Sequence, residues 1–248
     1  MEMVSIIMAA FNAQKTIGKA IESVIQQSYQ NWELIVINDC SSDDTPEIVE
    51  RYSDSRIKLI NNEHNYGVSR SRKRGLAAAK GNWIAILDSD DAWVPDKLEK
   101  QLCFARELKA SIVFSGSAFM DSEGRPLNWI LHVPHRLGYH ELLKQNLISN
   151  SSVLVKKDLY KSHYVTGDDL HEDFAIWLSI TKSGIDAYGI DEPLLIYRLA
   201  KASKSGNKLK AARMNWNTYR YSGLNVFSAF YYMCWYTVRG LKKYKNLV

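Results

Sequence analysis

The first 88 residues alternate short apolar runs with amphipathic segments, and this alternation constrains the fold more than any other feature. Apolar runs rich in β-branched residues occupy 4–10, 32–39, 56–62 and 83–88. Helical spacing of apolar residues begins at Ile17, a second helix is expected with Thr45 as N-cap and Pro46 at its first position, and a third from about 68 to 79. Continuous apolar strands joined by crossover helices predict a mostly parallel α/β sheet, covered by helices on both faces, with ligands at the carboxyl ends of its strands.

The composition is that of a folded soluble protein. The chain has 248 residues, 46% of them hydrophobic, which suits one large or two modest domains and excludes disordered and collagen-like classes. Its formal net charge of +5 favours anionic partners without choosing among nucleotides, nucleic acid and anionic lipid. Cys40, Cys103 and Cys234 are far apart, and no basic segment precedes the first apolar run. We therefore expect a reducing, cytoplasmic location and no signal peptide.

Aspartates gather where two of the apolar runs end. Asp39 and Asp43 follow the second run, and Asp88, Asp90 and Asp91 follow the fourth. Because the carboxyl ends of parallel strands lie at one edge of a sheet, both groups are expected to face one crevice. Carboxylates this close repel one another unless a cation lies among them. Without His or Cys nearby, they suit Mg²⁺ or Mn²⁺ bound together with a nucleotide diphosphate.

A basic segment lies between the two groups of aspartates. Gly67 precedes a predicted helix that carries Arg70, Arg72, Lys73 and Arg74 near its start. A helix amino terminus with guanidinium groups suits anion binding. Since helical spacing spreads these four side chains around the helix, we expect at least one Arg to point into the crevice and about half of the four to be solvated.

Each of these patterns also has an ordinary structural explanation. The aspartates at 88–91 could form a loop and helix cap, and Asp39 with Asp43 could form an Asx-turn that caps the next helix. The later "HEDF" could be a charged helix start. The three histidines between 132 and 140 are irregularly spaced, and we do not expect His132, His135 and His140 to bind zinc.

Five segments occur in the order and spacing of the glycosyltransferase family 2 enzymes. They are "SIIMAAFNA", "INDCSSDDT", "NYGVSRSRKRG", "LDSDDAW" and "HEDFAIWL". The chain resembles this family, and the later "YRLAKASKSGNKLKAARMNWNTYR" resembles its teichuronic acid biosynthesis branch. The resemblance implies a single Rossmann-like GT-A domain with a nucleotide-sugar-binding half (1–100), an acceptor-binding half (101–200) and a helical carboxyl-terminal extension (201–248). It also implies inverting, metal-dependent transfer from a UDP-sugar to a saccharide acceptor in bacterial cell-surface polysaccharide biosynthesis (O-antigen, capsule or teichuronic-type).

The resemblance assigns nucleotide and metal contacts to residues at the strand ends. Asp39 corresponds to an aspartate that binds the base of a uridine nucleotide, while Asp88 and Asp90 correspond to the ends of an Asp-x-Asp motif, near the ribose and on the divalent ion. The expected nucleotide-binding set is Ala10, Phe11, Asn12, Asp39, Arg72, Asp88, Ser89 and Arg198. The expected ligands of Mn²⁺ or Mg²⁺ are Asp90, Asp88 and Asp91.

The resemblance also assigns the chemical step. Asp173 of "HEDF" corresponds to the catalytic base, with the neighbouring Glu172 as the alternative. The chain departs from the family pattern twice, because Lys follows Arg72 where Asn is common, and the His that is common two places after Arg198 is missing. The contact of that missing His could come from Lys201, Lys204 or Lys208.

The carboxyl-terminal residues 224–238 are mostly apolar and aromatic, and they are followed by Arg239, Lys242, Lys243 and Lys245. The stretch is shorter than the roughly 20 residues that span a membrane. Aromatic residues beside basic ones fit a helix, from Leu224 to Lys245, on the inner leaflet of an anionic membrane, which would bring an enzyme to a lipid-linked saccharide acceptor. The alternative is a helix packed on the domain or in a homodimer interface. No nucleic-acid recognition motif occurs, so no nucleic-acid partner is expected.

Two other functions fit parts of the sequence. Nucleotidyl transfer also uses metal-bound aspartates, but no Gly- and Lys-rich triphosphate segment lies near the first apolar run. A non-catalytic nucleotide-binding module would not need a carboxylate at Asp173. The change Asp173→Asn therefore separates a binding module from a transferase.

Overall fold

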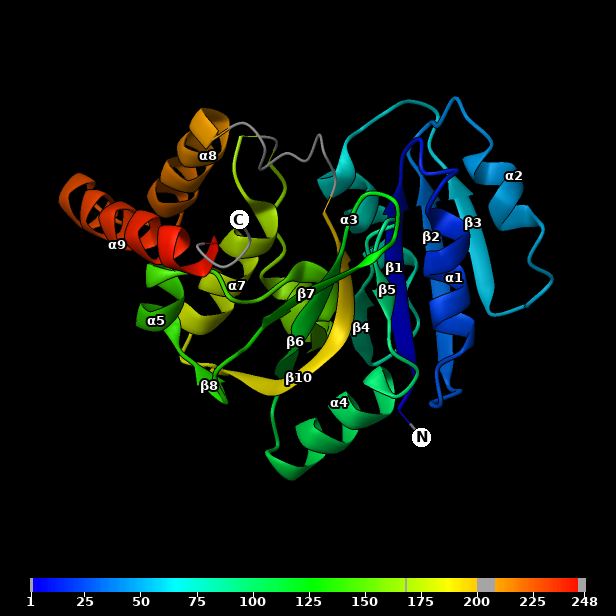
Figure 1. Cartoon of the computed structure of the whole chain (residues 1–248), viewed down its shortest axis with the longest axis horizontal. Helices are drawn as coiled ribbons and strands as arrows, with labels where there is room; N and C mark the ends of the chain where they lie inside the picture. Colours follow the sequence, from blue (N-terminus) through cyan, green and yellow to red (C-terminus); the bar gives the residue numbers. More distant parts are fainter. Residues whose placement is uncertain (1, 168, 200–207, 245–248) are drawn as a thin grey trace.

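The amino-terminal half of the chain builds parallel strands joined by helices. In the computed structural model, which describes residues 2–167, 169–199 and 208–244, these strands lie in the order β3-β2-β1-β4 (Figure 1). The elements are β1 (Val4–Ala10), α1 (Ile17–Ile25), β2 (Trp32–Asn38), α2 (Thr45–Glu50), β3 (Ile57–Asn61), α3 (Val68–Ala78) and β4 (Trp83–Ile86). All pairings among the four strands are parallel. The alternation and the parallel sheet that it predicts are confirmed in this half.

The start of α2 differs from the sequence expectation. Asp44 occupies the N-cap position, and Thr45 is the first residue of the helix. The Thr45 hydroxyl instead accepts a hydrogen bond from the N–H of Ala13 (2.8 Å). Asp43 accepts the N–H of Thr45 (3.1 Å), so Asp43 does form an Asx-turn, and it also accepts the N–H of Gln14 (3.1 Å). These bonds fasten the loop after β1 to the loop after β2.

The rest of the chain extends the same sheet. Among the described residues ten strands form one sheet, with the main order β3-β2-β1-β4-β9-β6-β10-β5. The added strands are β5 (Ala92–Trp93), β6 (Ile112–Met120), β7 (Pro126–Leu131), β8 (Arg136–Leu137), β9 (Leu154–Lys156) and β10 (Ala187–Arg198). β6 and β10 are parallel, while β9 lies antiparallel between β4 and β6. Because β5, β7 and β8 also pair antiparallel, the sheet is mixed in this half.

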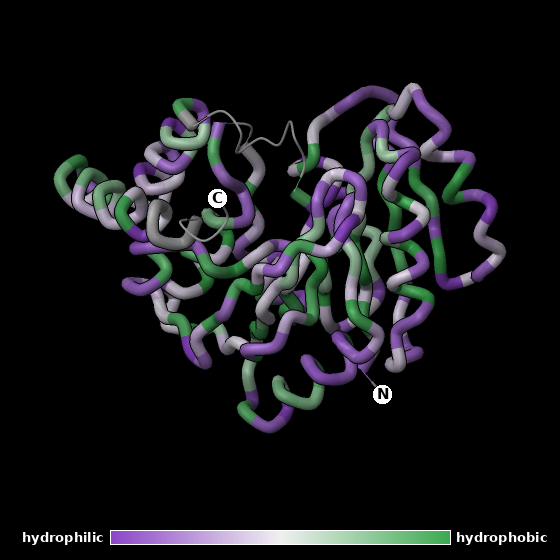
Figure 2. The backbone as a smooth tube through the Cα atoms, viewed as in Figure 1, coloured by the Kyte–Doolittle hydropathy of each residue, from purple (hydrophilic) through white to green (hydrophobic). Residues whose placement is uncertain are grey.

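Apolar residues fill both sides of the sheet, as Figure 2 shows by the hydrophobic colouring of the central strands. Alternate residues of one strand belong to different cores: Ile7 faces one side, and Ile6 and Met8 face the other. One core contains residues of α1, α2 and α4 (Lys97–Glu107). The other contains residues of α3, α5 (Tyr139–Lys144), α6 (Lys157–Ser162) and α7 (Glu172–Lys182). The expected helical layers on both faces are therefore present.

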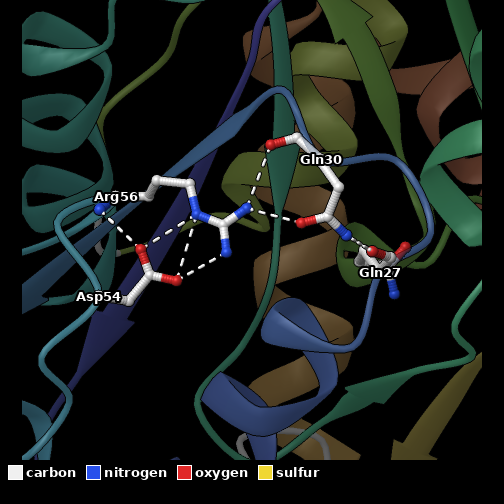
Figure 3. Close-up of polar contacts among 4 residues, drawn as sticks. All are labelled: Gln27, Gln30, Asp54 and Arg56. Carbon is white, nitrogen blue, oxygen red and sulfur yellow. Dashed lines mark hydrogen bonds and ion pairs between the residues drawn. The ribbon is translucent and has the colours of Figure 1, made fainter.

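A polar network of four residues precedes β2 and β3 in the chain, and Figure 3 shows it: Gln27, Gln30, Asp54 and Arg56. The Arg56 guanidinium donates to both carboxylate oxygens of Asp54 and to the backbone and side-chain oxygens of Gln30. Gln30 donates in turn to the carbonyl of Gln27. Arg56 also lies over the Trp32 ring, 3.7 Å from its centroid. The two charged residues of this network, Asp54 and Arg56, pair with each other. Such internal pairing is typical of residues that support the fold.

Two helices, α8 (Lys208–Tyr221) and α9 (Val226–Tyr244), follow the sheet and confirm the helical carboxyl-terminal tail. They lie at the edge of the molecule beside α5 and α7 (Figure 1). Tyr219 of α8 is fully buried and donates its hydroxyl to the carbonyl of Leu143 (2.6 Å). Thr218 accepts the N–H of His171, at the start of α7, at 3.0 Å. None of the described helices is both long enough and apolar enough to cross a membrane.

Candidate active site

The loops after β1 and β2 hold each other in an unusual backbone conformation. Asn12 and Cys40 both have positive φ angles, 50° and 61°, and Asn accepts this conformation more readily than most residues. The N–H of Asn12 donates to the Ser41 hydroxyl (3.0 Å), and the Asn12 side-chain oxygen accepts the N–H of Ser42 (2.9 Å). Phe11 is left half-exposed at the tip. The expected first nucleotide loop is thus a fixed structure with an exposed ring.

Asp39 is buried at the end of β2 and hydrogen-bonds to several other segments of the chain. Its N–H bonds to the carbonyl of Ala10 (2.8 Å). Its carboxylate accepts hydrogen bonds from the Asn62 amide (2.7 Å) and from the N–H groups of Tyr66 (2.9 Å) and Gly67 (2.8 Å). Burial raises the pKa of Asp39, but these hydrogen bonds outweigh it and hold the pKa below its usual value. Asp39 therefore fixes the loop that leads into α3.

Arg72 joins three elements through one guanidinium group. It alone of the four basic residues at 70, 72, 73 and 74 is buried, and the other three are exposed. Its Nη2 lies 2.5 Å from Asp88 Oδ1, after β4, and its Nη1 lies 2.8 Å from Glu172 Oε1, at the start of α7. Burial opposes the charge of Arg72, but Asp88 and Glu172 raise its pKa well above the usual value. The expectation that an Arg points inward is correct, whereas more of the four are solvated than expected.

The aspartates after β4 have different surroundings. The N–H of Asp88 donates to the Ser151 hydroxyl (3.1 Å). Asp90 is partly exposed, and its carboxylate makes no hydrogen bond to another described residue. Burial, and next the charge of Asp88, raise the pKa of Asp90. Ser89, between them, is also partly exposed.

Asp91 and Arg198 form a separate internal contact. Asp91 is buried, its Oδ1 accepts the N–H of Arg198 (2.9 Å), and its Oδ2 has no partner among the described residues. Burial, and then the charges of Asp88 and Asp90, raise the pKa of Asp91 well above its usual value. The Arg198 guanidinium donates to the carbonyl of Asp90 (2.9 Å) and, more weakly, to backbone carbonyls in the β6–β7 turn. Arg198 thus ties β10 to the aspartate segment.

Glu172 and Asp173 start α7, as the sequence predicts, but their environments differ. Glu172 is buried and paired with Arg72. Asp173 is partly exposed and makes no hydrogen bond or ion pair with any other described residue. The helix amino terminus favours negative charge at both positions. Of these two residues, Asp173 is the one whose carboxylate no other described residue engages.

The comparisons with known proteins identify the family. A family model described as Glycosyl transferase family 2 matches residues 5–161. The chain belongs to glycosyl transferase family 2. It is 39% identical over 220 residues to the "Putative teichuronic acid biosynthesis glycosyltransferase TuaG" of Bacillus subtilis, which covers 88% of this chain and 87% of TuaG. The resemblance to that branch is therefore confirmed, and the protein is a glycosyltransferase.

A second relative and a solved structure extend the match over nearly the whole glycosyltransferase. The chain is 36% identical over 250 residues to the "UDP-Glc:alpha-D-GlcNAc-diphosphoundecaprenol beta-1,3-glucosyltransferase WfgD" of Escherichia coli, covering 98% of this chain and 97% of WfgD. The crystal structure of S. aureus TarS 1-349 in complex with UDP-GlcNAc superposes with a TM-score of 0.75 at 16% identity, over 98% of this chain and 74% of that chain. The likeness to TarS supports the GT-A fold alone.

Asp88 and Asp90 suit a divalent cation in this glycosyltransferase. The described residues contain no group of three or more His, Cys, Asp or Glu side chains placed to hold a metal. Mg²⁺ is usually held by one or two protein carboxylates, with phosphate and water completing its shell, and the two partly exposed aspartates offer that number. Asp91 does not suit this role, in contrast to the sequence expectation, because it is buried and bonded to β10.

Sequence reasoning missed several polar residues that organise the site of this glycosyltransferase. Asn62 and Ser71 hydrogen-bond each other (2.9 Å) beneath Asp39, and Ser151 supports the backbone of Asp88. No motif marks these residues, because their partners are remote in sequence. The expected substitutes Lys201 and Lys204 lie outside the described residues, as do Ala200 and Lys245, and the side chain of Lys208 is not described. His132 and His140 bond separately to Asp191 and Tyr232.

Proposed function

We propose that this glycosyltransferase moves a sugar, with inversion, from a UDP-sugar to a lipid-linked saccharide during synthesis of a bacterial cell-surface polysaccharide. The observation that carries the proposal is the Arg72 bridge, which brings the aspartates after β4 and the start of α7 to one centre. Donor-binding and proton-accepting groups must meet in this way for a one-step displacement. WfgD, named for UDP-Glc and a diphosphoundecaprenol acceptor, matches 98% of the chain.

In this proposal Asp173 is the general base. An inverting transfer needs a carboxylate that takes the proton of the acceptor hydroxyl as the hydroxyl attacks the sugar, and such a base contributes roughly 10²–10⁴-fold. Asp173 supports this role because its carboxylate is partly exposed and not engaged by another described residue. Glu172, the alternative base, is paired with Arg72, and we propose that it positions Arg72.

Asp88 and Asp90 hold Mn²⁺ or Mg²⁺ in this proposal. The bound ion would supply charge stabilisation to the departing diphosphate. Asp90 is suited to face the ion because its carboxylate is partly exposed and has no other described partner. Asp88 offers a second oxygen, since Arg72 engages only its Oδ1. Asp91 supports this segment from within the fold rather than as a ligand.

The uridine would lie against the ends of β1 and β2. We assign the base contact to Asp39, whose Oδ2 accepts a single hydrogen bond and so keeps a lone pair. The two loops that Asp39 contacts carry the exposed rings of Phe11 and Tyr66, which could enclose the base. Ala10, Asn12, Ser89 and Arg72 remain in the proposed nucleotide set, and Arg198 joins it by positioning the aspartate segment.

A cytoplasmic location, peripheral to the inner face of the membrane, is part of the same proposal. The three cysteines are exposed and free, which suits a reducing compartment. Nucleotidyl transfer and simple nucleotide binding have no comparable support, because the loop from Phe11 to Thr16 contains no glycine and the family is one of glycosyltransferases.

The test combines nucleotide binding with sugar transfer. We expect calorimetry to detect UDP binding that depends on Mn²⁺, and Asp173→Asn to lower kcat by roughly 10²–10⁴-fold while leaving UDP affinity unchanged. Asp169→Asn is the matched control, because Asp169 is exposed in the preceding loop. Transfer is measured with a panel of UDP-sugars and a short-chain lipid diphosphate saccharide. Equal loss of UDP binding and transfer in Asp173→Asn would contradict the role of Asp173 as base. Binding of GDP or dTDP in place of UDP would contradict the assignment of a UDP-sugar as donor.

A further inference from the structure

Helix α9 has two apolar faces, and the described residues cover only one of them. Ala229, Tyr232, Met233 and Tyr236 pack on the core formed with α5, α7 and α8. The opposite face carries Phe227, Phe230, Tyr231, Cys234, Trp235 and Val238 at spacings of three and four residues. Phe227 is 87% exposed and Phe230 is 64% exposed. We call this set of six residues the outer face of α9.

The outer face is a continuous stripe rather than a scattering of apolar residues. Tyr231 is 53% exposed and Val238 is 50% exposed, so the stripe extends over three turns. Val226, four residues before Phe230, is also more than half exposed and lengthens the stripe. Single exposed apolar side chains need no explanation, but a contiguous apolar patch indicates an interaction surface.

All the charged residues in the sequence of α9 are basic. Helix α9 contains no Asp or Glu, and its last turns carry Arg239, Lys242 and Lys243. The Arg239 guanidinium lies 5.4 Å from the Trp235 ring centroid, and the Lys144 ammonium of α5 lies 5.9 Å from it. Trp235 thus sits where apolar and basic groups meet. This combination is typical of helices at the surface of anionic bilayers.

We propose that the outer face of α9 docks on an anionic lipid surface, with the helix lying in the plane of the interface. No described helix can cross a membrane, so the contact is peripheral. A second copy of the chain fits less well, because a two-fold pairing of outer faces gives the basic end of α9 no acidic partner on the other α9. The inference rests on the proposed peripheral location and deepens it by naming the surface that makes the contact, but it does not depend on the identity of the donor or acceptor.

The test uses the whole protein and vesicles of two compositions. We expect sedimentation with vesicles of phosphatidylcholine and phosphatidylglycerol, and much weaker sedimentation with phosphatidylcholine alone. The double variant Phe227→Ser/Phe230→Ser should lower the partition coefficient by roughly tenfold or more, because it removes two buried rings from the interface. Arg239→Gln should lower it by about fivefold, near 1 kcal/mol for the one charge that is removed. Ile130→Ser, at an exposed apolar residue of β7, is the control and should bind like the wild type.

Quenching by lipids brominated on their chains locates the contact. Tryptophan fluorescence should fall with such vesicles, and the fall should be largely lost in Trp235→Phe. Unchanged UDP binding in the serine variant would show that it is folded, and it separates this proposal from the proposed function. If the wild-type protein does not sediment with anionic vesicles, the proposal is wrong. If light scattering shows a dimer that the serine variant converts to a monomer, without vesicle binding, a second copy covers the face instead.

Discussion

The ends of β2 and β4 flank β1 at the same edge of the sheet, and both carry aspartates, but the protein treats them in opposite ways. Asp39, after β2, receives hydrogen bonds from Asn62, Tyr66 and Gly67, and its pKa is lowered. Asp90, after β4, has a raised pKa, and its carboxylate makes no hydrogen bond to another described residue.

The difference separates a scaffold from a ligand site. A carboxylate saturated by protein donors fixes a loop and gains stability from its charge. When a carboxylate is partly buried beside another carboxylate, its charge lowers the stability of the folded protein, and a bound cation would offset that loss. Identical side chains at neighbouring strand ends can therefore be assigned different roles from their partners alone. Four predictions test this contrast, from the largest expected effect to the smallest.

Removing the charge at the end of β4 should affect catalysis and spare the fold. Asp90→Asn should lower transfer by about 10²–10⁴-fold, because the metal contribution is several kcal/mol. Its melting temperature should be equal to or above that of the wild type, since a carboxylate near Asp88 is lost. Transfer assays and thermal unfolding measure both effects. If Asp90→Asn is instead destabilised enough to explain the lost activity, Asp90 stabilises the fold as Asp39 does, and the contrast between the two residues is wrong.

Breaking the bridge between the two halves of the site should lower stability. Glu172→Gln removes a charge from the buried pair with Arg72, and we expect the free energy of unfolding to fall by about 3 kcal/mol. Urea unfolding measures it, with Glu47→Gln, at an exposed position of α2, as the control. Loss of transfer without loss of stability would instead identify Glu172 as the base.

Removing the charge at the end of β2 should loosen the loop that enters α3. Asp39→Asn places an amide donor among N–H donors, and we expect a loss of about 1–3 kcal/mol of unfolding free energy, together with weaker UDP binding. Asp44→Asn, at an exposed position near Asp39 in sequence, should be close to neutral. If the two variants have the same stability, the hydrogen bonds to Asp39 do not hold the loop.

The smallest expected effect is on the pH dependence of the free energy of unfolding in acid. Because the pKa of Asp39 is lowered in the folded protein, its contribution is complete above the unfolded value of about 3.9 and is lost as the pH falls through the folded value. In urea titrations at stepped pH below about 5, Asp39→Asn should therefore lose stability less steeply than the wild type. Parallel curves would show that the charge of Asp39 has no special stabilisation.

Local sequence was sufficient for the elements of the first half, but in the second half it predicted helices and not the added strands. Apolar periodicity is a local property, and it predicted β1 to β4 and the crossover helices. The antiparallel strands β5, β7, β8 and β9 have two to six residues each, too few to show a period. The N-cap of α2 was wrongly assigned to Thr45, because the Thr45 hydroxyl accepts the N–H of Ala13, a residue on another loop. The individual site roles remain predictions, since their tests are the experiments above.

The sequence by itself determined the alternation of strands and helices, the aspartates at the strand ends, the acidic start of α7 and the family. Each of these depends on residues adjacent along the chain or on a motif of fixed spacing. Only the tertiary structure decided that Arg72 pairs with Glu172, that Asp91 turns into the fold and that one face of α9 is left uncovered by the described residues. The first two outcomes depend on contacts between residues about 100 positions apart, as between Arg72 and Glu172, and no local pattern encodes which partner a side chain will meet.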